Sequence, residues 1–413
     1  MYFRVPSSST SSSTLSSTPT GRAVLIDTEP KVINKCLDSK NQKLRNFKYD
    51  PRSACCVGDG GGAGNNWARG NSLFNVGRVR EEILDKIRRE IERNDRLSSF
   101  HIISSLAGGT GSGLGCAVTS GVKDSFSSKG LCMNTVVSPF SSGEVIVQDY
   151  NAALTLASLL RSSDGIVVMD NEVAVRKCKK GWRIERPKMD DVNRVMAEGL
   201  GGALKESYAS KSDEASRVRP HGIPTLVSHC VPHPSYKLLS ILHVPTMPRE
   251  SVEFTRDTWE GGVVGRLRQM SRTGCEVEQE IKWGVKEEMQ KFSPSPHKSP
   301  PAPPPTRRTD DVWEVPTSPF DSGFGYVYPP QNPSSPFACH RTYSKYRSFD
   351  KHGTLIQNSS LPALKALGRV EGAMRKHEAG AYLWQYEREG VGEGEWEEVW
   401  NTGTEALGNY RRL

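Results

Sequence analysis

The stretch AGGTGSG at residues 107–113 decides the fold class of this chain. The apolar run FHIISSL at 100–106 predicts a buried strand before it, and a helical pattern follows at about 113–128. Glycines at such a turn let successive backbone N–H groups converge on an anion, and the helix N-terminus adds partial positive charge. The hydroxyls of Thr110 and Ser112 add further donors. The sequence therefore predicts a phosphate-binding loop at the end of a strand.

Two common nucleotide loops are excluded. No Gly-Lys-Ser/Thr closes the glycine run, so it is not a Walker A loop. No acidic residue ends a following strand at the distance that a dinucleotide-binding motif requires. On its own, the run is equally compatible with a tight strand-to-helix turn that binds nothing.

The segments around the glycine loop predict an α/β fold. Apolar runs alternate with helical patterns from residue 21 to about 242. The expected strands are 22–27, 100–106, 131–138 and 165–170, and the expected helices include 78–95 and 151–161. This alternation is typical of a doubly wound, mostly parallel sheet.

Composition excludes several classes of protein. The 413 residues suffice for two to three domains, and no run of 18 apolar residues occurs, so no membrane span is expected. Nine cysteines without a C-x-x-C pair speak against a zinc ribbon or a thioredoxin-like site and are expected to be reduced thiols. The net charge of +8 is spread along the chain, so we expect no nucleic-acid partner.

The loop and its continuation, AGGTGSGLG, resemble the signature loop of the tubulin superfamily and its bacterial division relatives. Further segments agree with that resemblance: AVLIDTEPKVI (23–33), AGNNWARG (63–70), VIVQDYNAALTL (145–156), MDNEVAVRKC (169–178) and DDVNRV (190–195). Each fragment alone could supply only strand-end charges, turn residues or a helix cap. Their shared order favours the tubulin superfamily.

The resemblance implies GTP or GDP with Mg²⁺ as cofactors and assigns residues to each part of the nucleotide. The phosphate contacts would be Asn65, Ala107, Gly108, Gly109, Thr110, Gly111 and Ser112. The ribose contacts would be Glu144 and Gln148, the guanine contacts Asn171, Met189 and Asn193, and the metal ligands Asp27 and Glu29. Two carboxylates one residue apart suit a hard cation that keeps several waters.

No catalytic residue is assigned. By the same resemblance, Thr225 stands at the position of the acid that activates water in a neighbouring subunit, and a threonine cannot take that proton near neutral pH. The alternative is that Thr225 only caps or enters a helix and that Asp213 or Glu214 acts instead. GTPase activity is therefore expected to be weak or to depend on an adjoining tubulin subunit.

Several segments resemble the delta subfamily in particular: NNWARG, SSGEVIVQDYN, CVPHPSYKLLS, RTYSKY and YLWQYEREG. The resemblance implies a structural or regulatory role in centriole, basal-body or cilium microtubules of the cytoplasmic cytoskeleton. Its partners would be alpha-, beta- and epsilon-tubulin. The alternatives are a non-assembling GTP-binding fragment and a stand-alone GTPase.

The expected organisation has five parts. They are a disordered Ser/Thr-rich tail (1–20), a GTP-binding domain (21–220), a core-helix end with the start of a second α+β domain (221–292), a Pro-rich insertion (293–337), and the rest of that domain with C-terminal helices (338–413).

Four departures from the family pattern bear on function. The first strand and its Gly-Gln-Cys-Gly-Asn-Gln loop are not found before Gly21, which predicts weak GTP binding unless the gene model has lost an exon. Met189 replaces an aromatic ring against guanine, and the Pro-rich insertion occupies the place of central strands. An acidic C-terminal tail is not found, and the pI is about 8.9.

Overall fold

The computed structural model describes residues 3–4, 18–38, 47–94, 97–141, 146–204, 222–248, 259–281 and 352–412. The Pro-rich insertion at 293–337 and most of the predicted tail lie outside these residues. Part of the tail does have a described place, because β1 (Phe3–Arg4) pairs antiparallel with β2 (Thr20–Gly21).

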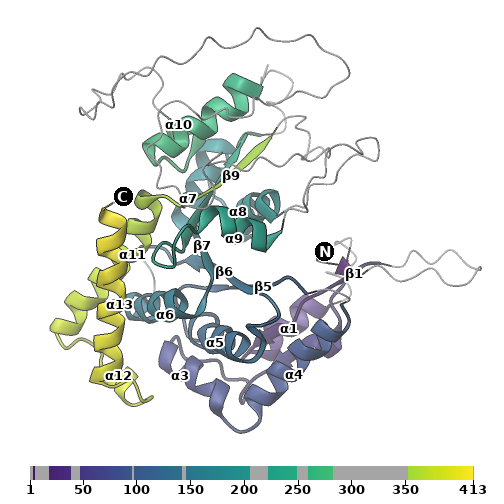
Figure 1. Ribbon diagram of the computed structural model, residues 1–413, viewed down its shortest axis with the longest axis vertical. Helices are drawn as coiled ribbons and strands as arrows, with labels where there is room; N and C mark the ends of the chain where they lie inside the picture. The colour runs from purple at the N-terminus through teal and green to yellow at the C-terminus, as the bar shows by residue number, and fades with distance from the viewer. Residues whose placement is uncertain are drawn as a thin grey trace, which may run out of the picture.

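A five-stranded sheet forms the centre of the molecule (Figure 1). Its order is β5 (Ser99–Ser105), β6 (Leu131–Ser138), β7 (Gly165–Asp170), β8 (Leu238–Val244) and β9 (Gly353–Gln357). The first four strands are parallel and β9 is antiparallel to β8. Because Ser105 pairs with Val137 and Ser138 with Asp170, the carboxyl ends of β5, β6 and β7 meet at one edge. The mostly parallel sheet is as predicted.

Helices cover both faces of this sheet, as a doubly wound fold requires (Figure 1). One face carries α5 (Gly115–Phe126), α6 (Gln148–Ser162), α11 (Ser360–Glu378) and α13 (Glu393–Arg411), and the other carries α8 (Met189–Leu204) and α9 (Ile223–Cys230). On β6, Cys132 packs with α5 and Val136 with α6, whereas Met133 packs with α8 and α9. The strand is almost wholly buried because both of its faces are covered.

A smaller parallel pair lies beside the main sheet. It consists of β3 (Leu25–Asp27) and β4 (Ala54–Cys56), with α1 (Pro30–Leu37) after β3, a 3₁₀ turn (Pro51–Ser53) before β4, and α3 (Trp67–Ser72) with a 3₁₀ turn (Leu73–Asn75) after it. Apolar side chains, including Ile26 and Cys55, pack against α5 and α4 (Val79–Glu92). Within the part of the chain that the structure describes, no strand joins β3 to β5.

The predicted second domain is described only in part. Its two described strands, β8 and β9, extend the main sheet, and α10 (Gly265–Thr273), preceded by a π-helical turn (Trp259–Val264), packs on them. Short elements complete the chain: π-helical turns at Thr110–Leu114 and Lys177–Gly181, α7 (Asn171–Arg176), a 3₁₀ turn (Glu278–Glu280) and α12 (Trp384–Glu387). No described helix is long and apolar enough to cross a membrane.

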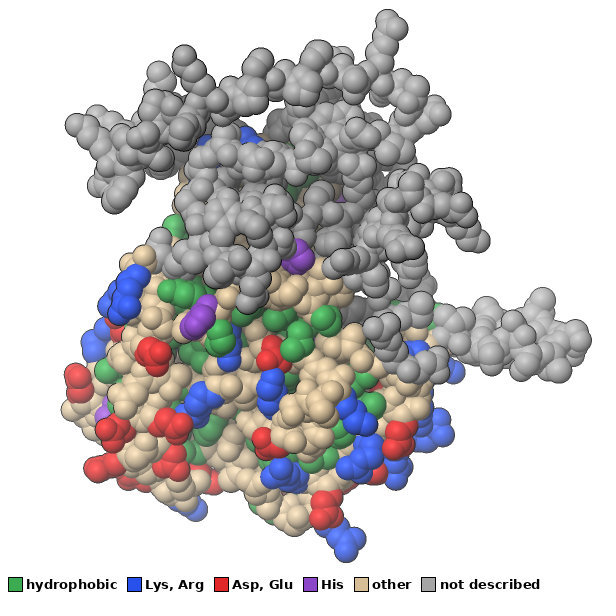
Figure 2. Space-filling model, viewed as in Figure 1, with side chains coloured by type: hydrophobic (Ala, Val, Ile, Leu, Met, Phe, Trp, Pro, Cys, Tyr) green, Lys and Arg blue, Asp and Glu red, His purple; other side chains and the backbone are tan. Residues whose placement is uncertain are grey.

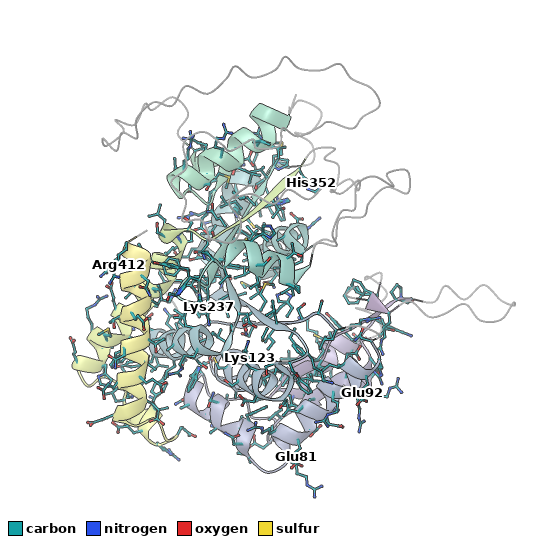
Figure 3. The ribbon with its side chains drawn as sticks, viewed as in Figure 1. Glu81, Glu92, Lys123, Lys237, His352 and Arg412 are labelled. Atoms are coloured by element: carbon teal, nitrogen blue, oxygen red, sulfur yellow. The ribbon has the colours of Figure 1, made fainter. Side chains whose placement is uncertain are left out.

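Two lysines, Lys123 and Lys237, make contacts at the edge of the sheet where β6 and β7 begin, and both are labelled in Figure 3. Lys123 Nζ lies 2.6 Å from Asp164 Oδ1, and Asp164 Oδ2 accepts a 2.7 Å hydrogen bond from Cys132 N. Lys237 Nζ donates to Leu160 O at 2.6 Å, and burial lowers the pKa of this lysine. These groups are used in packing. Open α/β sheets bind their ligands at the opposite, carboxyl edge.

The cysteines behave as structural thiols. All eight that lie in the described ranges are free, as expected. Burial raises the pKa of Cys132 to about 12 and that of Cys116 to about 11, so neither forms a reactive thiolate near neutral pH.

Candidate nucleotide-binding site

The glycine loop is held against α3 at distances that no side chain would permit. A Cβ on Gly113 would lie 2.0 Å from Trp67 O, and a Cβ on Gly109 would lie 2.6 Å from Ala63 Cβ. Gly108 has a φ of +107°, which disfavours any residue with a side chain. The Ser112 hydroxyl donates to Gly108 O. The glycines are therefore required for packing, whether or not the loop also binds an anion. They hold the loop at the end of β5.

The two predicted metal ligands lie next to this loop. Thr28, between them, has its hydroxyl 2.6 Å from the Thr110 hydroxyl. Glu29 N donates to Asp27 Oδ1 at 3.0 Å, and the Glu29 carboxylate pairs with Lys31 at 2.8 Å. A donor set of carboxylate and hydroxyl oxygens beside a phosphate loop is what a hard divalent cation requires.

The 63–66 turn carries Asn65, the remaining predicted phosphate contact. Asn65 adopts a left-handed φ of +52°, and its carbonyl accepts a 2.7 Å hydrogen bond from Asn151 Nδ2. Asn66 is the N-cap of α3, since its side chain accepts from Arg69 N at 3.2 Å. The capping role thus belongs to Asn66 and not to Asn65, whose contact with phosphate stays a prediction.

The predicted ribose loop is hydrogen-bonded to the segment that carries the predicted guanine contact Asn171. Gln148 opens α6, and its side-chain amide donates to Phe140 O at 3.2 Å and to Ser141 O at 3.4 Å. Glu172 on α7 accepts from Ser141 N at 2.8 Å and from the Ser141 hydroxyl. These bonds hold the pKa of the Glu172 carboxyl below its usual 4.5. Glu144 lies outside the described residues.

The predicted guanine residues lie at the start of two adjacent helices. Asp170 caps α7 by accepting from Glu172 N and Val173 N at 2.7 and 3.1 Å, so Asn171 is not the cap. Instead, Asn171 Oδ1 is buried and has no hydrogen-bond partner. Such an atom is costly to leave unsatisfied.

Met189 and Asn193 project from one side of α8. Met189 is its first residue and is 53% exposed, and Asn193, one turn later, is exposed as well. A spacing of four residues places both on the same helical face. The structure thus leaves them open to a ligand, next to α7, whose Ala174 packs against Val192 of α8.

Basic residues on α11 form ion pairs with both α6 and the end of β7. Arg369 and Lys376 pair with Asp149 at 3.2 and 2.6 Å, and Lys365 pairs with Asp170 at 2.9 Å. Asp149 follows Gln148, and Asp170 precedes Asn171. Sequence reasoning missed these three bases, although spacings of four and seven residues place them on one face of a helix.

Thr225 lies in the first turn of α9 and is half-buried. Its carbonyl accepts from the Ser228 hydroxyl at 2.9 Å and from His229 Nδ1 at 2.8 Å. Thr225 therefore enters the helix, and its correspondence to the activating acid stays a prediction. Asp213 and Glu214 lie outside the described residues.

A family model described as the Tubulin/FtsZ family, GTPase domain, matches residues 9–179. The chain is 34% identical to the tubulin delta chain of Homo sapiens over 407 residues, which cover 96% of this chain and 87% of that relative. This chain belongs to the tubulin family. The tubulin delta chain of Mus musculus is 35% identical over 385 residues, 91% of this chain and 82% of the relative.

A further relative of this tubulin matches over less of its length. The tubulin delta chain of Macaca fascicularis is 42% identical over 265 residues, which span 64% of this chain and 57% of the relative. The family model spans the predicted metal, phosphate and ribose segments and Asn171, while Met189, Asn193 and Thr225 lie beyond its last residue. The prediction from the loop sequences that the chain belongs to the tubulin family is therefore confirmed. The roles of the individual residues stay predictions.

Proposed function

We propose that this delta-like tubulin binds GTP or GDP with Mg²⁺ at the carboxyl edge of its sheet. The observation that carries the proposal is the 2.6 Å contact between Thr28 and Thr110, which holds the Asp27–Glu29 loop against the glycine loop. Carboxylates and converging backbone N–H groups are thereby brought to one place. The ion, when bound, would neutralise phosphate charge there.

The residues proposed to contact the base favour guanine over adenine. A side-chain amide offers one acceptor and two donors, which match the adjacent N–H groups and carbonyl on one edge of guanine. Asn171 supplies a buried acceptor without a partner, and Asn193 supplies a second amide from α8. Adenine presents a different order of donors and acceptors, so it would leave the amides unpaired.

We further propose a structural and regulatory role in centriole, basal-body or cilium microtubules, with alpha-, beta- or epsilon-tubulin as partners. The similarity to delta chains over most of this chain supports this role. Because Thr225 is not a general base, the chain binds nucleotide without triggering hydrolysis in a neighbour. The competing reading is a stand-alone GTPase or a non-assembling fragment.

The nucleotide proposal is tested by competition of GTP and ATP against a fluorescent GTP analogue bound to the full chain. We expect GTP to compete far better than ATP, and we expect ATP to compete comparably in the double variant Asn171→Ala/Asn193→Ala. Asn401→Ala, which removes an exposed amide on α13, should leave the preference intact. Equal competition by ATP in the native chain would refute the proposal, and an undiminished preference in the double variant would refute the base-reading assignment.

The lattice proposal is tested by sedimentation of the chain with and without assembling alpha- and beta-tubulin. Co-sedimentation that requires assembly conditions is expected. A chain that stays in the supernatant at every tubulin concentration would favour the competing reading.

A further inference from the structure

A buried asparagine joins three distant parts of the fold. Asn151, on α6, is fully buried. Its Oδ1 accepts from Trp67 N at 2.9 Å and from the Tyr386 hydroxyl at 2.7 Å, and its Nδ2 donates to Asn65 O at 2.7 Å. The amide has only one orientation that fits, because a flipped Nδ2 would face the N–H of Trp67.

The turn that Asn151 holds contains a left-handed residue. Asn65 has a φ of +52°, a conformation that few residues other than glycine and asparagine adopt. The turn also lies against the glycine loop, since a Cβ on Gly109 would lie 2.7 Å from Ala63 O and 3.0 Å from Asn66 O. A shift of this turn would therefore move Asn65 relative to the glycine loop.

The third part comes from the C-terminal helices. Tyr386 lies on α12, 235 residues from Asn151, and is fully buried. Its ring packs edge-on against Tyr150 at 5.4 Å and against Trp396 at 5.5 Å. Burial raises the pKa of Tyr386, so the hydroxyl remains a donor at all physiological pH values. The donor is therefore fixed in both place and protonation.

Two further contacts bind the same segment to the site. Asn66 Nδ2 donates to Gln385 O at 2.9 Å, and the Tyr150 hydroxyl donates to Ala381 O at 2.9 Å. The residues from Ala381 to Tyr386 thus touch both the phosphate turn and the ribose helix. A displacement of this segment would disturb the turn through Asn151 and Asn66 together.

We propose that Tyr386 and Asn151 are positioning residues for the phosphate contact of Asn65, so that the docked C-terminal helices set the affinity for the phosphates. This inference rests on the proposed nucleotide site and adds to it. Neither side chain needs to touch the nucleotide. Loss of the Tyr386 hydroxyl should therefore weaken the binding of phosphates and leave the binding of the base unchanged.

The test is Tyr386→Phe in the full chain, with the affinities for GTP and for guanosine both measured by competition. Guanosine has no phosphates, so the ratio of the two affinities isolates the phosphate contact. We expect GTP to bind about three- to tenfold more weakly, the effect of one net hydrogen bond, with guanosine unchanged.

The matched control is Tyr410→Phe. Tyr410 is equally buried, and its hydroxyl accepts from Leu238 N at 2.8 Å, on the strand that lies beyond the base-reading strand. Loss of the Tyr410 hydroxyl should lower the unfolding temperature about as much as loss of the Tyr386 hydroxyl. It should leave the ratio of the GTP and guanosine affinities unchanged. A merely structural role for Tyr386 would give the same result as this control.

Two further variants make the result decisive. At a pH where its carboxyl is ionised, Asn151→Asp keeps the acceptor for Trp67 N and Tyr386 but cannot donate to Asn65 O, so the same change in ratio is expected. Adding Tyr386→Phe to Asn65→Ala should weaken GTP binding no further, because the Asn65 side chain, through which Tyr386 acts, is already absent. An unchanged ratio in Tyr386→Phe and Asn151→Asp overturns the proposal, whereas a native chain that fails to prefer GTP over ATP overturns the nucleotide site itself.

Discussion

Gly113 shows why a glycine is required in the loop after β5. Its position is set by α3, since a Cβ there would lie 2.0 Å from Trp67 O and 2.8 Å from Asn71 N. Both atoms belong to the backbone, which cannot rotate away. By contrast, a Cβ on Gly368, inside α11, would meet no atom within 4 Å. The same substitution should therefore have opposite effects at the two positions.

We predict that Gly113→Ala destabilises the chain by about 1–3 kcal/mol or more, because a methyl group must push two backbone segments apart. Gly368→Ala should be neutral or stabilise by up to about 1 kcal/mol, because alanine favours the helix. Urea unfolding measures both. A Gly113→Ala variant as stable as the native chain would show that the loop can move away from α3.

At the scale of elements, the loop after β6 and the helix after β7 are joined by a charged contact. Glu172 of α7 accepts two hydrogen bonds from Ser141 and so has a pKa below 4.5. A carboxyl with a lowered folded-state pKa stabilises the fold above its unfolded pKa and loses this contribution as the pH falls through the folded value. The contact therefore stabilises the nucleotide edge at neutral pH.

We predict that Glu172→Gln lowers stability at pH 6–7 and that its difference from the native chain disappears as the pH falls well below 4.5. The expected difference is small because the group is solvent-accessible. Thermal unfolding of both forms between pH 3 and 7 gives the measurement. A difference that persists unchanged at the acid end would mean that the charge of Glu172 is not what Ser141 recognises.

Elements with strong periodicity could be predicted from the sequence. The strands 131–138 and 165–170 have the predicted bounds, because apolar residues bounded by turns leave little choice. The break between α11, which ends at Glu378, and α12, which begins at Trp384, lies where Gly380 and Tyr382 have φ values of +65° and +62°. Gly380 is a signal for a helix end that was available in the sequence.

Contacts between distant elements could not be predicted in this way. The site residues named from the loops belong to segments with a recognisable pattern. Asn151 and Tyr386 show no such pattern. The sequence near a tyrosine on a C-terminal helix does not indicate which distant amide its hydroxyl will bond to. Burial and pairing are properties of the folded chain, and only the folded chain reveals them.

At the scale of the whole molecule, charge is unevenly distributed. On the face shown in Figure 2, Asp and Glu side chains gather over the C-terminal helices, and many of the Lys and Arg side chains lie toward α4 on the other side. The net charge of +8 is therefore not spread evenly over the surface. Uneven charge favours defined orientations when such molecules associate.

Within an assembly, we predict that Thr225→Asp raises GTP turnover at least tenfold, a threshold set below the roughly 10²- to 10⁴-fold effect that is typical of a general base. The reason is that a carboxylate can accept a proton from water and a threonine cannot. Turnover is measured in co-assembly with alpha- and beta-tubulin. Ser228→Asp, on the exposed side of the same helix, controls for the added charge. Equal turnover in the native chain and Thr225→Asp would remove the assignment.

The packing of the C-terminal helices also gives the molecule an optical reporter. Trp396 and Trp400 are stacked at 5.2 Å with their planes 16° apart, and Trp396 lies 5.5 Å from Tyr386. Two indole rings this close couple their electronic transitions, so the pair should produce a near-ultraviolet circular dichroism band that disappears when the rings separate. That band depends on tertiary packing and not on helix content. Undocking of these helices from the phosphate turn could therefore be observed spectroscopically, without a label.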